Sequence, residues 1–193
     1  MRLHASQIVE NYIKPLPKYL IQRESFRQQI GANNSLILGI HLRGTDKGDG
    51  RKRTDVHDYI PYITSFFNAL PPGSGKLFVA TDDSRLLSLL HQNNITNVYS
   101  HHNVLRSDGD EANFNKFKSK LAVVNEHVYQ DILMLSTCDY LLHGDSAVSE
   151  SVIYLNFNLH YRSVNIDRDD KTSPINFQEQ VQKQWELMKF SNS

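Results

Sequence analysis

The chain has 193 residues and no formal net charge at pH 7, since 21 lysines and arginines balance 21 aspartates and glutamates. This length suits one domain, or one domain and a terminal appendage, and is enough to bury a core. The absence of a basic block argues against a nucleic-acid partner. Cys138 is the only cysteine, which excludes an internal disulfide and zinc sites built from two or more cysteines. The sequence shows neither a membrane-spanning run nor a signal-peptide core, so we expect a soluble chain.

The first half of the chain alternates between helical and strand patterns. The segment Lys14-Pro-Leu-Pro17 separates two helical pieces, because Pro17 suits the first turn of a helix and Gly31 suits its end. Leu36 to Leu42 form a short aliphatic run of the kind found in buried parallel strands. The elements predicted here are helices over 3–31, a strand over 36–42, a helix over 54–70, a strand over 76–80 and a short helix over 86–90 that Ser84 would cap.

The second half continues the alternation after a long polar loop over residues 101–119, and long loops in compact domains often bind ligands. Its predicted elements are a strand over 97–100, a helix over 121–136, a strand over 139–143, a helix after 146, a strand near 162–166 and a helix over 176–190. In the helix over 121–136 we expect an inner face of Val124, Val128, Ile132 and Leu135, which Asp131 would border.

This order of elements predicts an α/β fold with an open, mostly parallel sheet between two layers of helices. We expect an N-terminal helical segment over residues 1–34, a central domain over 35–170 and a C-terminal helix over 171–193. Because such folds support many functions, the function has to be inferred from the site.

Polar side chains follow three of the predicted strands, at the points where these strands end. They are the segment from His41 to Lys47, the pair Asp82-Asp83 and the segment from His143 to Ser146. Since parallel strands place their carboxyl ends at one edge of a sheet, neighbouring strands would bring these groups together where ligands bind. The alternative is a set of ordinary solvent-exposed charges.

The residue types at this edge suit a nucleoside diphosphate. Arg43 offers a planar fork for phosphate and Lys47 offers a second cation. Ser146 stands at a strand-to-helix turn, where a hydroxyl and backbone amides can bind an anion. Asp131 can accept the paired N–H groups of a guanine edge, or it can equally be a structural carboxylate that accepts from backbone amides.

Other chemistries find less support in the sequence. No G-x-G-x-x-G, G-x-x-x-x-G-K-[ST] or G-x-S-x-G motif is present, which argues against most NAD enzymes, P-loop NTPases and α/β hydrolases. The histidines form no i,i+4 metal pair on a helix. Asp82-Asp83 can ligate Mg²⁺, but adjacent carboxylates at a strand end more often cap the next helix or bind a sugar hydroxyl. We therefore predict no metal site.

Three motifs resemble the superfamily of α-1,6-fucosyltransferases and nodulation fucosyltransferases. They are His41-Leu-Arg-Gly-Thr-Asp-Lys47, Ala80-Thr-Asp-Asp83 and the stretch from Asp131 to Ala147. The similarity extends over roughly residues 12–166. It implies the Rossmann-like C-terminal donor half of a two-domain GT-B glycosyltransferase, which binds GDP-fucose and transfers fucose to a glycan acceptor with inversion and without a metal or other cofactor.

The resemblance also implies roles for individual residues. Arg43 would bind the β-phosphate and stabilise the departing GDP, while His41 and Asp131 would hold guanine. Ser146 and the amide of Ala147 would bind the diphosphate. The donor pocket would include Asp46, Lys47, Asp82 and Asp83, and the catalytic set would be Arg43, Asp46, Lys47 and Asp49, with Asp49 the nearest candidate for the base.

The chain departs from the family pattern in three ways. Gly44 stands where the family usually has a second arginine, and Ala147 stands where a second serine is common. The length matches the donor half alone, so the acceptor-binding half would be missing or supplied elsewhere. A nucleotide-sugar-binding module without transfer activity of its own is therefore an alternative, and an unrelated hydrolase-like or phosphatase-like domain is a third. The Golgi lumen and the cytoplasm are both compatible with the sequence.

Overall fold

The structure is a computed structural model that describes residues 1–45, 55–95 and 97–191. Its centre is a sheet of five strands in the order β3-β2-β1-β4-β5, and every neighbouring pair is parallel. The predicted α/β class is therefore confirmed. The strands are β1 (Leu36–Leu42), β2 (Gly75–Thr81), β3 (Val98–Tyr99), β4 (Tyr140–His143) and β5 (Ser163–Asn165).

The strand order creates a switch point beside β1. The chain runs outward from β1 to β2 and β3, then returns to the other side of β1 with β4 and β5. In register, His41 at the end of β1 lies between Ala80 of β2 and His143 of β4. Ligands of open α/β sheets bind outside the carboxyl ends of the strands at such a point.

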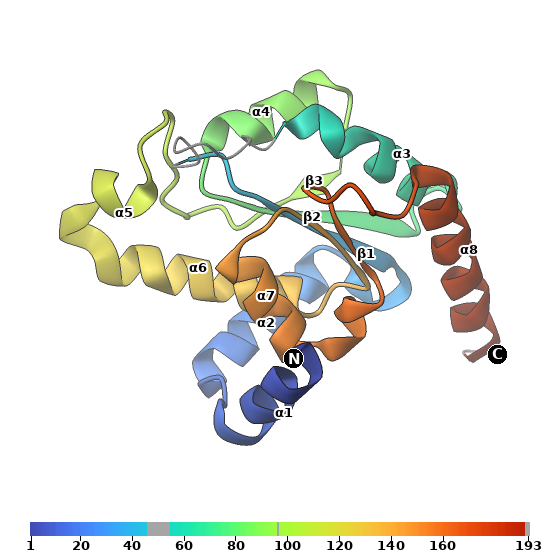
Figure 1. Cartoon of the computed structure of the whole chain (residues 1–193), viewed down its shortest axis with the longest axis horizontal. Coiled ribbons are helices and arrows are strands. Elements are labelled where there is room, and N and C mark those ends of the chain that lie inside the picture. The colour runs from blue at the N-terminus through green and yellow to red at the C-terminus, as the bar shows by residue number, and fades with distance from the viewer. Residues whose placement is uncertain (46–54, 96, 192–193) are drawn as a thin grey trace.

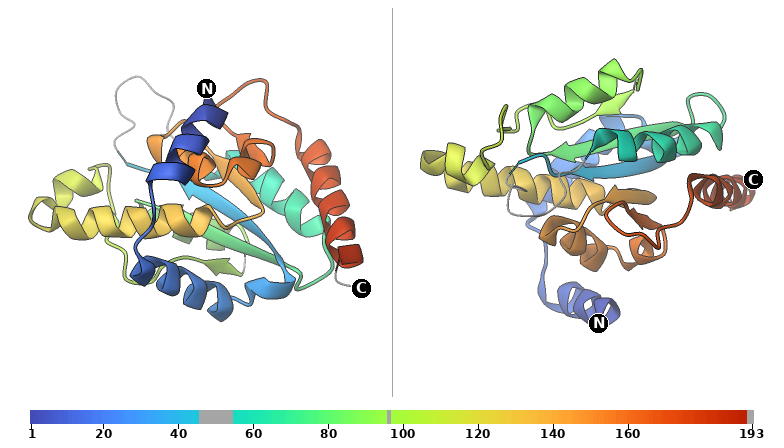
Figure 2. Two further views of the ribbon diagram at one scale, coloured as in Figure 1. Left: turned by 90° about the horizontal axis from the view of Figure 1, so that it is seen from below. Right: turned by 45° about the horizontal axis from the view of Figure 1, so that its top comes forward.

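Helices cover both faces of the sheet and make three layers (Figures 1 and 2). On one face lie α2, α6 and α7, with α1 packed against α7; on the other lie α3 and α4, with α8 against α3. The helices are α1 (Arg2–Tyr12), α2 (Pro17–Gln29), α3 (Ile60–Asn68), α4 (Ser84–Gln92), α5 (Asn113–Lys116), α6 (Leu121–Leu135), α7 (Ala147–Leu155) and α8 (Pro174–Ser191), with 3₁₀ turns over Ala32–Asn34, Val56–Asp58, Lys118–Lys120 and Phe157–His160.

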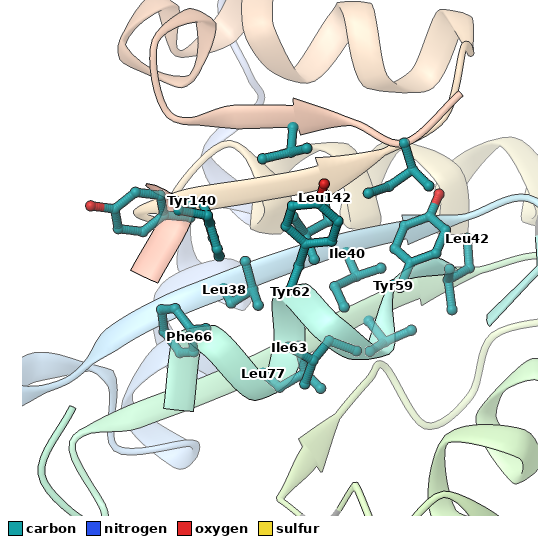
Figure 3. Close-up of a cluster of buried hydrophobic side chains, with 14 of the residues drawn as sticks. Leu38, Ile40, Leu42, Tyr59, Tyr62, Ile63, Phe66, Leu77, Tyr140 and Leu142 are labelled. Atoms are coloured by element: carbon teal, nitrogen blue, oxygen red, sulfur yellow. The ribbon is translucent and has the colours of Figure 1, made fainter. Parts of the chain in front are cut away.

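The alternation of side chains along β1 divides the core in two. Leu38, Ile40 and Leu42 point toward α3, where Tyr59, Tyr62, Ile63 and Phe66 pack onto them, as Figure 3 shows. Ile37 belongs to the second cluster, which includes Met134 and Leu135 of α6 and Val152 and Ile153 of α7. Because both faces of β1 are covered, all seven of its residues are buried, as its apolar run predicted.

Two local predictions were wrong. The cap of α4 is Asp83 and not Ser84, because the Asp83 carboxylate accepts a hydrogen bond from the Arg85 amide at 2.9 Å. On α6, Val128 is exposed and the inner face turns toward Asp131 and Met134, which are buried. The spacing of four residues between Val124 and Val128 predicts that both face inward. In the structure the inward position is instead occupied by the polar side chain of Asp131, at the end of the sheet.

Among the described residues, no helix combines the length and the apolar composition that a bilayer crossing requires.

Candidate functional site

A cavity of about 180 Å³ opens at the carboxyl edge of the sheet. It lies where the ends of β1 and β2 meet helices α5, α6 and α7. It brings together four of the predicted site residues, namely His41, Arg43, Asp82 and Asp131. The remaining lining residues are Thr45, Ala80, Thr81, Ala112, Asn113, Phe114, Val124, Asn125, Val128 and Val148.

Asp82 fixes the mouth of the cavity on the side of β2. One carboxylate oxygen accepts from the Gly44 amide at 2.8 Å, and the other accepts from the Thr45 hydroxyl at 2.5 Å. Burial raises the pKa of Asp82, while these two bonds and the nearby charge of Arg43 oppose that rise. The end of β1 is thereby tied to the end of β2, and Arg43 is held on the rim beside a carboxylate.

Asp83, the next residue, has a different role. Its side chain is almost fully buried, caps α4 and forms an ion pair with the Arg85 guanidinium, with Nη2 to Oδ2 at 2.6 Å. The same guanidinium group also contacts Asp110 at 3.1 Å. Asp83 is not among the residues that line the cavity. The sequence left three roles open for Asp82-Asp83, namely a Mg²⁺ ligand, a helix cap and a partner for a sugar hydroxyl. The geometry shows that Asp83 is a helix cap.

Asp131 enters the cavity from α6 and is 7% exposed. Its Oδ1 lies 2.7 Å from Nδ1 of His101, a residue in the loop after β3. Among the described residues, the partner of this carboxylate is therefore a histidine side chain and not a backbone amide. The sequence interpretation did not place His101 in this site, although the rule that polar residues after strand ends converge applies equally to the third strand.

Arg106 is a second residue that the sequence interpretation missed. Its Nε donates to the Thr81 carbonyl at 3.2 Å, and its Nη2 donates to the His101 carbonyl at 3.1 Å. Burial lowers its pKa, and the negative charge of Asp131 opposes that change. Arg106 thus anchors the loop after β3 to the end of β2 and places a positive charge near Asp131.

His41 lies on the floor of the cavity and is buried. Its Nδ1 forms a hydrogen bond of 3.0 Å with the Ser149 hydroxyl on α7. His143, its register partner on β4, donates from Nδ1 to the Gly144 carbonyl at 2.9 Å, and burial lowers its pKa. Burial therefore favours the neutral imidazole at His143.

The N-terminus of α7 approaches the cavity from the switch point. Ser146 stands at the turn into this helix as predicted, and its hydroxyl caps the helix by accepting from the Val148 amide at 3.2 Å. Val148 lines the cavity, whereas Ser146 and Ala147 are outside its lining. The first turn of the helix thus stands next to the cavity, with backbone amides and the positive end of the helix dipole on that side.

Gly44 has a steric reason for being glycine. A Cβ atom at this position would lie 2.5 Å from Cβ of Asp83 and 2.8 Å from Cδ1 of Leu86. Both neighbours belong to the cap and first turn of α4, so a side chain at position 44 would push that helix away from β1. The second arginine of the family pattern would have no room here.

Three of the predicted catalytic residues, Asp46, Lys47 and Asp49, lie outside the described residues. Within residues 1–45, 55–95 and 97–191, no three His, Cys, Asp or Glu side chains gather in a group that could hold a metal ion.

Chemically, the cavity combines the Asp131 carboxylate, which His101 holds, with the buried imidazole of His41 and the guanidinium group of Arg43 on its rim. A carboxylate can accept from paired N–H donors, and a guanidinium suits a phosphate. The volume of about 180 Å³ is below the range of about 300–1,000 Å³ that is typical for whole ligands. The cavity therefore suits one part of a larger ligand, such as a nucleobase, with the charged part of that ligand at the rim.

Comparison with known proteins gives matches in structure but not in sequence. Neither a protein-family model nor a curated protein matches the chain. A NodZ α-1,6-fucosyltransferase structure soaked with GDP-fucose matches with a TM-score of 0.59 at 14% identity, over 86% of this chain and 51% of that one. Fucosyltransferase NodZ from Bradyrhizobium matches with a TM-score of 0.58 at 14% identity, over 86% and 50% of the two chains.

A NodZ structure co-crystallised with GDP matches with a TM-score of 0.53 at 15% identity, over 77% of this chain and 44% of that one. The chain spans about half the length of these solved structures. At such low identity the likeness establishes the fold. The chain therefore has the Rossmann-like α/β fold of a region that makes up about half of the fucosyltransferase NodZ.

Proposed function

We propose that the cavity binds the guanine end of a GDP-sugar, with GDP-fucose as the donor, and that the chain is the donor-binding part of a fucosyltransferase-like enzyme. One observation carries the proposal: His41 of β1, Arg43 just after this strand and Asp131 of α6 line one cavity at the switch point of the sheet. The likeness in fold to NodZ structures obtained with GDP-fucose and with GDP supports the same donor.

In this proposal, each part of the donor meets a different group. Asp131 accepts from the N–H donors of guanine, and His41 lies beside the base. Arg43 on the rim binds the β-phosphate. The backbone amides at the start of α7, including that of Ala147, and the Ser146 hydroxyl bind the diphosphate. Asp82 holds the rim in place through Gly44 and Thr45.

The proposed reaction is a single displacement in which fucose passes to a hydroxyl of a glycan acceptor with inversion at the anomeric carbon. The C–O bond to the β-phosphate breaks, and GDP leaves with the bonding electrons. Fixed positive groups aimed at this developing charge would lower the barrier. Arg43, Lys47 and the start of α7 fill this role without a metal, Asp46 completes the pocket, and Asp49 takes the proton of the acceptor hydroxyl.

The second candidate is a nucleotide-sugar-binding module that does not transfer the sugar alone. The chain spans about half the length of the NodZ structures that it matches. In that case the acceptor would be bound by a region or partner outside this sequence.

Two measurements test the proposal. Calorimetry with GDP should detect binding, and Arg43→Ala should weaken it at least tenfold, because a charge-assisted bond contributes about 1.5–3 kcal/mol. Arg162→Ala is the matched control, since Arg162 precedes β5 at the opposite edge of the sheet and bonds Gln184. An Arg43→Ala variant with wild-type affinity would contradict the phosphate role.

The release of GDP from GDP-fucose, measured with and without a mixture of glycan acceptors, separates the two candidates. Acceptor-dependent release supports the transferase. Tight GDP binding without any release supports the binding module.

A further inference from the structure

His101 occupies the wall between two cavities. Its Nδ1 lies 2.7 Å from Oδ1 of Asp131, which lines the 180 Å³ cavity at the end of the sheet. The His101 side chain itself lines a larger groove of about 600 Å³ between α2 and α6. His101 thus reaches Asp131 from behind, on the side that faces away from the proposed base.

The imidazole ring of His101 is held on two sides. It packs against Phe26 of α2 with ring centroids 4.7 Å apart and against Phe78 of β2 at 5.4 Å. The His101 carbonyl accepts from Arg106, which is itself bonded to the end of β2. These contacts fix the ring with Nδ1 toward the carboxylate. Since an ionised carboxylate only accepts, Nδ1 carries the proton in this bond.

The bond has a consequence for the other carboxylate oxygen. Within the part of the chain that the structure describes, His101 is the one side chain that donates a hydrogen bond to Asp131. One oxygen is therefore occupied and the plane of the carboxylate is set, while Oδ2 stays available to a ligand. A guanine edge presents adjacent N1–H and N2–H donors to such a group. Uracil offers a single N–H between two carbonyl groups and cannot match it.

We infer that His101 is a positioning residue that orients Asp131 for guanine, so that the preference for GDP over other nucleoside diphosphates depends on a histidine outside the donor pocket. This inference rests on the proposed function. It adds that base selectivity depends on the contact between the loop after β3 and helix α6, and not on Asp131 alone.

Three variants test the inference. His101→Phe keeps an aromatic ring between Phe26 and Phe78 but removes the donor. His101→Asn removes the ring but keeps an N–H donor close to the position of Nδ1. His102→Phe is the control, because His102 is exposed and lines the same groove, whereas the bond to Asp131 comes from His101.

The measurements are the dissociation constants for GDP and UDP by calorimetry, together with thermal unfolding of each variant. We expect His101→Phe to weaken GDP binding about tenfold or more and to leave UDP binding nearly unchanged, so that the GDP-to-UDP preference falls. His101→Asn should keep the preference within about threefold of the wild type. His102→Phe should behave like the wild type.

The outcomes separate this inference from the proposed function. A purely structural role for His101 would lower the unfolding temperature without changing the GDP-to-UDP preference, and that result would overturn the inference alone. A wild-type chain that binds GDP no better than UDP would overturn the guanine assignment and the inference together.

Discussion

At each of the two edges of the central sheet, an aspartate accepts a hydrogen bond from a backbone amide of the β1 segment, but the two edges differ in function. At the carboxyl edge, Asp82 after β2 accepts from the amide of Gly44 after β1 at 2.8 Å. At the amino edge, Asp139 before β4 accepts from the amide of Ile37 in β1 at 2.7 Å. In both cases a carboxylate ties β1 to a neighbouring strand, and burial raises the pKa of that carboxylate.

The difference lies in the surroundings of the two carboxylates. Asp82 also accepts from Thr45 and lines a cavity together with Arg43. Asp139 lies in the segment between the end of α6 and the start of β4, at the edge where the strands begin. At the carboxyl edge the loops on either side of the switch point turn away from each other and leave room for a ligand. The same type of bond can therefore support ligand binding at Asp82 and stability alone at Asp139.

The largest effect is expected for glycines at the two edges. Gly44→Ala places a Cβ against Asp83 and Leu86 at the start of α4, where the nearest atom, Cβ of Asp83, cannot move without the backbone. We expect a loss of about 2–3 kcal/mol in the free energy of unfolding, measured with urea. Gly75→Ala at the amino end of β2 meets only side-chain ends, of Leu70, Phe66 and Phe67, and should lose about 1 kcal/mol. Equal losses would contradict the steric account of Gly44.

A smaller effect is expected from removing each carboxylate. Asp139→Ala leaves the Ile37 amide without its acceptor and should cost about 1–2 kcal/mol of stability, with GDP affinity unchanged. Asp82→Ala should cost a similar amount and also weaken GDP binding, because the rim that holds Arg43 loosens. The comparison of the two edges fails if Asp139→Ala weakens GDP binding as strongly as Asp82→Ala.

The two carboxylates should also share a dependence on pH. Because burial raises the pKa of both above 3.8 in the folded state, the stability that each contributes is full at low pH and is lost as pH rises through the folded pKa. Asp82→Asn and Asp139→Asn should therefore become more stable relative to the wild type between pH 4 and pH 7. Urea unfolding at several pH values would show this, and a constant difference would argue against the raised pKa.

The smallest effect is expected at His143, where the sign is opposite. Burial lowers the pKa of His143 below 6.5, so the unfolded chain binds the proton first. The stability that this residue contributes is present above pH 6.5 and is lost as pH falls below that value. His143→Asn keeps a donor for the Gly144 carbonyl and should show a flatter stability profile between pH 6.5 and pH 5. An unchanged profile would show that His143 does not contribute to the acid sensitivity.

Much of the fold and part of the site were predictable from local patterns. The aliphatic run over 36–42 predicted the central strand, and polar residues after three strands predicted a site at the carboxyl edge. Arg43, Asp82 and Asp131 do lie together there with His41. The turn at Ser146 into the next helix was also predictable, because helix starts depend on a few adjacent residues.

The sequence by itself thus determined which elements form and at which edge their polar residues gather, since periodicity and strand ends are local properties. Tertiary structure decided how these residues are used. It assigned Asp83 to Arg85 and the cap of α4, left no room for a side chain at Gly44, and placed His101 behind Asp131, thirty residues away along the chain. Such pairings depend on which strands are neighbours and how closely helices approach them, and no local pattern of residues carries that information.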